Sequence, residues 1–426
     1  MTARDGGRES FPAPRRPCYK VYTMHDSMTP RERMMTALRG GRPDRVPAAP
    51  DISNMVPCRL TGKPFWDIYL DDDPPRWKAY LDAVRRYGMD GWFTYGSLGY
   101  RTEWTVEREE SRYFDAAANR WYKREVVHTP HGDLTGLRAY PVADSPTPVE
   151  KYVKDFREDF PKLLHLFPKI TGFDDALFRE QKKALGELGI MAIAATPPGF
   201  HSLLGYFQGG VEAITYAYYD HPDLFHELAS VIEQRALEEA ACAIEAGTDS
   251  ILTGGSGSLT LQSPEIWREL SLPGLKKITR MCREAGVISG IHSCGRERYM
   301  VKVCAEETDL DYINPLEIPP MGDCGLAECK KAHGKRLALF GNLHTTEVML
   351  RGSVQDVRRE SLKAIRDAGE GGGFVLSTGD QCGRDTPDGN ILAMVETARE
   401  FGTYPLDMAR IEAEIRSLEG SGKGKG

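Results

Sequence analysis

The sequence has no hydrophobic segment long enough to cross a membrane. No run approaches the 18 consecutive apolar residues that indicate a transmembrane helix. The N-terminus also lacks the apolar core that a secretory signal peptide requires. We therefore expect a cytoplasmic protein without a membrane partner.

The chain also lacks an excess of basic charge and a paired cysteine framework. Its formal net charge is −7, with both signs dispersed, so no basic face is expected for nucleic acid. Nine cysteines, an odd number, are scattered over 426 residues, unlike the disulfide framework of a small secreted domain. Reduced thiols or metal ligands are the better expectation. Small molecules or proteins are the expected partners, and a homo-oligomer is compatible with the composition.

Strand-like and helix-like segments alternate along most of the chain. Strands are predicted at 45–51, 91–95, 189–196, 250–253, 311–317 and 336–343, and in the apolar runs that begin at Val287 and Phe374. Predicted helices between the later strands include 223–246, 264–285 and 354–368. Eight strands with intervening helices predict an α/β fold, a (β/α)8 TIM barrel.

The barrel is predicted to span residues 29–418, between two other segments. Residues 1–28 are rich in Arg, Pro, Ser and Gly and are expected to form a disordered leader, while 419–426 are expected to form a flexible tail. Order should begin at Thr29, which can form a capping box with Glu32. Residues 100–147 alternate short apolar segments with turn signals and predict a small antiparallel insertion after the second strand. This insertion either forms a wall of the active site or extends the surface without a function, and the sequence favours neither role.

The most informative stretch is Val287–Gly295, an apolar run that ends in His-x-Cys. In an extended strand the side chains of His292 and Cys294 point to the same face, about 7 Å apart. Cys382 follows another apolar run, and the C-terminal ends of parallel barrel strands meet at one mouth. One imidazole and two thiolates suit Zn²⁺ with one position left open. Each residue alone is more often a packing residue, so the prediction rests on the three together.

Other polar residues near predicted strand ends are weaker candidates for site residues. Asp51, Asn342, His344 and Asp380 are placed to orient ligands or to contact substrate, although capping and turn hydrogen bonds explain such residues more often than a catalytic role does. His201, Tyr206 and Trp267 are candidates for lining a pocket, but aromatic residues at such spacing more often belong to the core.

Several segments resemble the uroporphyrinogen decarboxylase superfamily. They are 263–265 (Ser-Pro-Glu), 272–278, 292–295 (His-Ser-Cys-Gly), 340–343 (Phe-Gly-Asn-Leu) and 385–387 (Asp-Thr-Pro), together with the N-terminal segment 29–47. The resemblance covers roughly residues 29–405 and implies a distorted (β/α)8 barrel. Within that superfamily, His-x-Cys with a distant Cys is the mark of the corrinoid-linked methyltransferases that resemble methylcobamide:coenzyme M methyltransferase.

This resemblance implies a zinc site at His292, Cys294 and Cys382, with Glu317 as an acidic ligand or substrate-displaced group. Glu317 and Asp51 are the predicted catalytic residues, the latter from its place at a predicted strand end, and Asn342 and His344 are the predicted cofactor-binding residues. The implied cofactors are Zn²⁺ and a corrinoid carried by a partner protein. The family's decarboxylases carry arginines that grip substrate carboxylates in the N-terminal region, whereas residues 47–53 here contain none.

Three functions are therefore considered. The first is zinc-dependent methyl transfer between a corrinoid (cobalamin) protein and a small methylated substrate, namely a methoxy compound, an amine or a thiol. The second is a uroporphyrinogen decarboxylase-like carboxy-lyase of porphyrin metabolism, and the third is a binding module without turnover. Either direction of methyl transfer fits the chemistry. Demethylation of a methoxy donor is preferred, because the insertion suggests a pocket for a bulky substrate.

Overall fold

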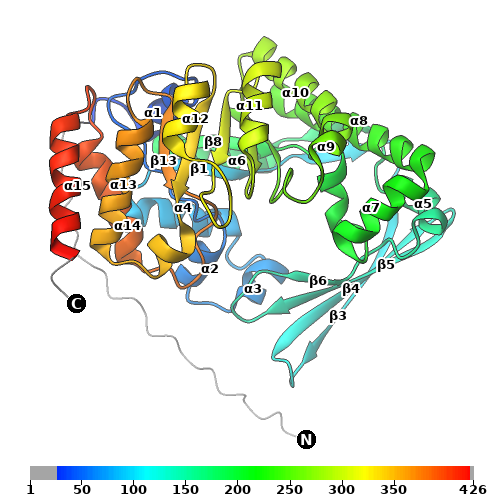
Figure 1. Cartoon of the computed structure of the whole chain (residues 1–426). Coiled ribbons are helices and arrows are strands. Elements are labelled where there is room, and N and C mark those ends of the chain that lie inside the picture. The colour runs from blue at the N-terminus through cyan, green and yellow to red at the C-terminus, as the bar shows by residue number, and fades with distance from the viewer. Residues whose placement is uncertain (1–25, 423–426) are drawn as a thin grey trace, which may run out of the picture.

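A parallel sheet curled into a barrel forms the centre of the computed structural model, which describes residues 26–422 (Figure 1). Seven strands are hydrogen-bonded in the order β1, β8, β9, β10, β11, β12, β13. Their bounds are β1 Gly91–Gly96, β8 Gly189–Ala194, β9 Ser250–Gly254, β10 Ile288–Ser293, β11 Tyr312–Pro315, β12 Ala338–Leu343 and β13 Phe374–Thr378. All six pairings are parallel. The predicted α/β barrel is confirmed.

The strand predicted at 45–51 occupies the remaining place in the barrel but is too irregular to form a ladder. The Leu376 amide donates to Pro47 O and the Ala49 amide donates to Leu376 O, both at 2.9 Å. On the other side, the Asp90 amide donates to Ala48 O at 2.9 Å, just before β1. Pro47 and Pro50 have no N–H to donate, so continuous pairing is impossible and only isolated bridges form. This segment joins β13 to β1 and closes the barrel.

Helices cover the outside of the sheet (Figure 1). The principal ones are α1 Pro30–Leu38, α4 Arg76–Tyr87, α6 Ala176–Leu185, α8 Pro222–Glu245, α11 Arg298–Glu307, α12 Leu326–His333, α13 Val354–Ala368, α14 Asp388–Phe401 and α15 Met408–Gly422. The predicted helix 264–285 breaks at Ser271 into α9 Pro264–Leu270 and α10 Leu272–Ala285. Shorter helices are α2 Met55–Leu60, α3 Phe65–Leu70, α5 Phe156–Leu164 and α7 Gly210–Asp220. Thr29 and Glu32 form the predicted capping box of α1.

Large side chains fill the half of the barrel interior that lies towards the N-terminal ends of the strands. One buried cluster joins Trp92, Ile190, Ile288, Tyr312, Phe340 and Val375 from six strands with Met34 and Leu38 from α1. The rings of Trp92 and Phe340 are 4.9 Å apart, and the Trp92 indole N–H donates to the Tyr312 hydroxyl at 3.2 Å. Since this end is packed solid and covered by α1, polar chemistry is confined to the C-terminal ends of the strands.

The predicted insertion is a four-stranded antiparallel sheet, β3 Glu107–Asp115, β4 Arg120–Thr129, β5 Gly132–Pro141 and β6 Thr147–Glu150. It extends to one side of the barrel (Figure 1). A separate pair, β2 Gly99–Thr102 with β7 Ile170–Asp174, connects it to the body of the protein. Nearly every residue of β3 is exposed, so this strand is an open edge. The structure therefore confirms the antiparallel insertion, and its role stays a prediction.

Both predicted terminal segments are shorter than expected within the described part of the chain. Asp26 accepts a hydrogen bond from Arg45 Nε at 3.1 Å, and the Met28 amide donates to Asp44 at 3.1 Å, so residues 26–28 are anchored to the barrel and do not belong to a free leader. Helix α15 continues to Gly422, four residues into the predicted tail. Residues 1–25 and 423–426 lie outside the described residues, and within 26–422 no helix has the length and hydropathy of a membrane span.

A buried ion-pair network lies at the N-terminal end of the barrel strands. Asp90 is 1% exposed and accepts hydrogen bonds from Arg33 Nη1 at 2.6 Å, Arg45 Nη1 at 2.9 Å and the Ala48 amide at 2.9 Å. Burial alone would raise the pKa of Asp90, but Arg45 and Arg33 outweigh it and hold that pKa below its usual value. The carboxylate thus joins α1, the closing segment and β1.

We expect Asp90→Asn to lower the free energy of unfolding by about 3 kcal/mol, because the buried guanidinium groups of Arg33 and Arg45 lose one of their carboxylate partners and keep only Asp44 and Asp26. Chemical denaturation at neutral pH measures this change. Asp82→Asn, which removes only an exposed contact with Arg85, is the matched control and should shift stability by less than about 0.5 kcal/mol. Because the folded-state pKa of Asp90 lies below the unfolded value, its contribution is complete above pH ~4 and declines as the pH falls through the folded pKa. Equal stabilities of both variants and the parent would contradict this role.

Candidate metal centre

His292 is held by the strand register at the C-terminal end of β10. It pairs with Asn314 of β11, and its Nδ1 lies 2.6 Å from Asn314 Oδ1. Because the amide oxygen can only accept, Nδ1 carries the proton and Nε2 presents its lone pair. Asn314 is fully buried and its position is fixed by β11, so the ring orientation is fixed as well.

Cys294 follows β10 and is supported on both sides by backbone contacts. Its carbonyl accepts from the Gly257 amide at 3.1 Å, and the next amide, of Gly295, donates to Glu317 Oε2 at 2.6 Å. Gly295 has φ +102°, and a Cβ there would lie 2.2 Å from Thr260 Oγ1, so this bend requires glycine. Burial, assisted by the Asp380 carboxylate, raises the pKa of the Cys294 thiol to about 12.

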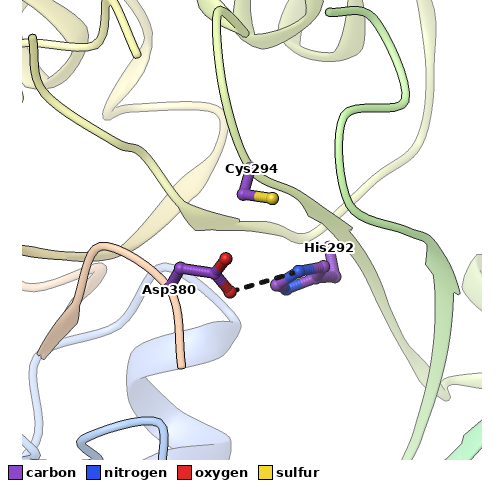
Figure 2. Close-up of side chains that lie close together, drawn as sticks. All are labelled: His292, Cys294 and Asp380. Carbon is purple, nitrogen blue, oxygen red and sulfur yellow. Dashed lines mark ion pairs between the residues drawn. The ribbon is translucent and has the colours of Figure 1, made fainter. Parts of the chain in front are cut away.

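Asp380 completes a cluster with these two residues from the loop after β13. Its carboxylate lies 3.8 Å from His292 Nε2, and Figure 2 shows His292, Cys294 and Asp380 facing a common space. The three ligand atoms all lie within 4.8 Å of one another. Asp380 has φ +134°, unusual for a residue with a Cβ, and its carbonyl accepts from Thr378 Oγ1 at 2.6 Å. Such backbone conformations concentrate at functional sites.

The chemistry of this donor set fits a divalent cation. Ligand atoms 2.0–2.3 Å from a tetrahedral zinc are roughly 3.3–3.8 Å apart, so only small side-chain movements separate the cluster from a coordination shell. A thiolate and a carboxylate would offset the charge of Zn²⁺, and three protein ligands leave the fourth position open. His292, Cys294 and Asp380 are therefore the residues that would hold the metal.

Cys382 lies outside this cluster, although the sequence analysis expected it as the third ligand. Its amide donates to Asp51 O at 2.7 Å, and its side chain is fully buried. Burial raises the pKa of the Cys382 thiol to about 12, an effect that the Thr378 and Thr386 hydroxyls only partly oppose. Ligation by Cys382 stays a prediction.

The two predicted acidic residues lie beside the cluster. Burial raises the pKa of Asp51, and Asp380 adds to this, while His292 and the Ser53 amide oppose it. Burial also raises the pKa of Glu317, again with a contribution from Asp380. Both carboxyl groups therefore retain a proton at higher pH than an exposed acid does. They are placed to hold or transfer protons at the mouth of the barrel.

Asn342 and His344 already have structural partners. Asn342 Nδ2 donates to Leu316 O at 2.8 Å and to Cys324 O at 3.2 Å. His344 Nδ1 accepts from the Thr346 and Glu347 amides and caps the short helix Thr345–Leu350. These contacts are of the capping and turn type that the sequence also allowed. Cofactor binding by either residue stays a prediction.

The sequence analysis missed Asn314 as a support for His292 and gave His201 only a minor role. His201 lies close enough to His292 to be affected by its charge, and burial together with His292 lowers the pKa of His201 to about 4. Neither residue lies in a metal-ligand motif. Only the pairing of β10 with β11, which the sequence does not specify, brings Asn314 beside the imidazole.

A family profile described as uroporphyrinogen decarboxylase (URO-D) matches residues 182–401, more than half of the chain. The chain belongs to the uroporphyrinogen decarboxylase family. This confirms the superfamily resemblance that the motifs indicated. The matched region contains β8 to β13 and all three residues of the cluster.

Relatives in this family fall into two groups. A methylcobamide:CoM methyltransferase, MtaA of Methanosarcina barkeri, is 28% identical over 180 residues, which are 42% of this chain and 50% of the relative. The MtbA enzyme of Methanosarcina mazei is 27% identical over 163 residues, covering 38% of this chain and 45% of the relative. These matches span about half of each relative. A uroporphyrinogen decarboxylase of Neisseria meningitidis is 23% identical over 313 residues, 70% of this chain and 82% of the relative.

A solved structure described as a methyltransferase from Methanosarcina mazei has the same fold. It superposes with a TM-score of 0.58 at 16% sequence identity and covers 88% of this chain and 99% of its own. This similarity supports the barrel architecture.

We expect Asn314→Ala to weaken zinc binding by about 10–100-fold, because His292 loses the acceptor that fixes its tautomer and ring orientation. Competition with a chromophoric chelator measures the affinity of the folded protein. Asn342→Ala is the control, since it removes an equivalent buried amide that does not contact His292. It should reduce stability without changing zinc affinity. Equal affinity in the Asn314 variant and the parent would exclude the orienting role.

Proposed function

We propose that this protein is a zinc-dependent methyltransferase that moves a methyl group between a small methylated substrate and a corrinoid carried by a partner protein. The convergence of His292, Cys294 and Asp380 at the barrel mouth carries the proposal. The relatives named methylcobamide:CoM methyltransferases support it. The substrate class is a methoxy compound, an amine or a thiol, with a methoxy donor preferred.

Each group at the mouth has a distinct task in this proposal. When bound, Zn²⁺ supplies Lewis acidity to the heteroatom that carries, or will carry, the methyl group. His292, Cys294 and Asp380 hold it, and Asn314 orients the imidazole. Glu317 and Asp51, whose pKa values are raised by burial, are the carboxyl groups that would deliver a proton to the leaving oxygen or nitrogen. Their burial keeps bulk water away from the reacting atoms.

A uroporphyrinogen decarboxylase-like carboxy-lyase is the second candidate. The observation that favours it is the longer match to the Neisseria decarboxylase, which covers 70% of this chain. In that case the carboxyl groups of Asp51 and Glu317 would serve proton transfer without a metal. The absence of arginine from residues 47–53 makes this second choice weaker.

We expect the purified protein to contain about one zinc per chain. Asp380→Asn and Cys294→Ser should each deplete the metal, because each removes a charged ligand, and both should leave the barrel folded. Cys382→Ser is the matched control and should retain the zinc, which elemental analysis and circular dichroism together measure. If the Cys382 variant lost its zinc and the Asp380 variant retained it, Cys382 and not Asp380 would be the third zinc ligand. Full retention in all three variants would refute the metal centre.

We expect the zinc-loaded protein to methylate a Co(I) corrinoid, which gives methyl-Co(III), when a methoxylated compound is supplied. The absorption spectrum of the cobalt measures this reaction. Asp380→Asn should lower this rate by at least about 100-fold, since the Lewis acid is lost. Methylation of a simple thiol by methylcobalamin, without reaction of Co(I), would reverse the preferred direction. Release of carbon dioxide from uroporphyrinogen with no cobalt reaction would support the second candidate.

A further inference from the structure

A small cavity lies on the outer side of the barrel wall, between β9 and the helices α9 and α10. Its volume accessible to the centre of a water molecule is about 20 Å³, and its lining includes His201, Thr253, Ser271, Trp267, Leu275 and Ile291. A single water needs roughly 10–15 Å³ by this measure. The cavity thus has room for a water molecule.

Three polar atoms of the lining residues are buried without a hydrogen-bond partner in the described part of the chain. They are Thr253 Oγ1, Ser271 Oγ and His201 Nδ1. Thr253 is 3% exposed and Ser271 is 6% exposed, so bulk water does not satisfy them. Ser271 stands at the N-cap of α10, yet its hydroxyl caps no backbone amide. Buried polar groups are rarely left unpaired, and one water in the cavity that these residues line would give each atom a partner.

We infer that this cavity binds one ordered water molecule, held by Thr253, Ser271 and His201. The water donates one hydrogen to His201 Nδ1 and the other to one hydroxyl oxygen, and it accepts a hydrogen bond from the second hydroxyl. All three orphaned atoms then have a partner, and the water makes three hydrogen bonds. This site is separate from the metal cluster and does not depend on the proposed function.

In this arrangement His201 Nδ1 accepts a hydrogen bond from the water. Since Nδ1 accepts from the water, the proton of the neutral ring resides on Nε2, and the lowered pKa of His201, about 4, keeps the ring neutral at pH 7. Nε2 lies over Gly255, where an added Cβ would be only 1.9 Å away. Gly255 begins the loop whose Gly257 amide donates to the Cys294 carbonyl. His201 is therefore a positioning residue that packs the loop beside the metal centre.

The sign of a stability change tests the water site. Thr253→Val keeps the shape and suits a strand, so only the hydroxyl is lost. If the water is present, the variant loses a hydrogen bond and its Tm falls by roughly 1–3 °C. Ser361→Ala is the control, because Ser361 Oγ is also buried and unpartnered but does not line this cavity, and its removal should leave the Tm unchanged or higher. An unchanged or raised Tm in Thr253→Val would mean a dry cavity and would overturn the inference.

The tautomer of His201 provides an independent readout in the metal-free protein. Long-range ¹H–¹⁵N correlation spectra at pH 7 should show a single Nε2–H form for His201, assigned by its loss in His201→Gln. In the double variant Thr253→Val, Ser271→Ala the ring should populate both tautomers, because the water is no longer held. A spectrum of the double variant identical to that of the parent would refute the bound water.

Discussion

Closure of the barrel depends on one buried carboxylate. The segment that occupies the eighth strand position contains Pro47 and Pro50 and forms only isolated bridges, so backbone pairing alone holds it weakly. Asp90 compensates by binding Arg33, Arg45 and the Ala48 amide simultaneously. Removal of Asp90 would leave both guanidinium groups with only the more exposed Asp44 and Asp26 as charge partners, so the members of the network depend on one another. The closed sheet then brings the ends of β10 and β13 together at the opposite face.

The mouth of the barrel concentrates negative charge around one imidazole. Asp51, Glu317 and Asp380 all come close to His292, and the burial that raises two of their pKa values reflects the cost of placing several carboxylates in one poorly solvated space. A divalent cation ligated by His292, Cys294 and Asp380 would relieve that repulsion. The same site therefore combines a metal-binding set with carboxyl groups that can keep a proton, a combination that proton-coupled group transfer requires.

Two parts of the chain contribute differently to this arrangement. The family match, residues 182–401, includes β8 to β13 and the metal-binding cluster. The preceding part supplies Asp51, the closing segment and the antiparallel insertion, which lies outside that match. The three clustered residues thus lie within residues 182–401, whereas Asp51 and the antiparallel insertion come from the part of the chain that precedes them. The ordered water proposed behind β9 would link His201, Thr253 and Ser271, which all lie in the matched part.

The sequence by itself determined the barrel, the insertion and two of the three clustered residues. Alternation of apolar strands with amphipathic helices specifies a parallel sheet, and period-two geometry places His292 and Cys294 on one side of a strand end. Only the tertiary structure brings the Asp380 carboxylate to 3.8 Å from His292 Nε2, because the loop after β13, in which Asp380 has φ +134°, is positioned by packing that no spacing rule predicts. It also decided that Asn314 supports His292, since the register of two strands depends on the packing of the whole sheet and not on either strand alone.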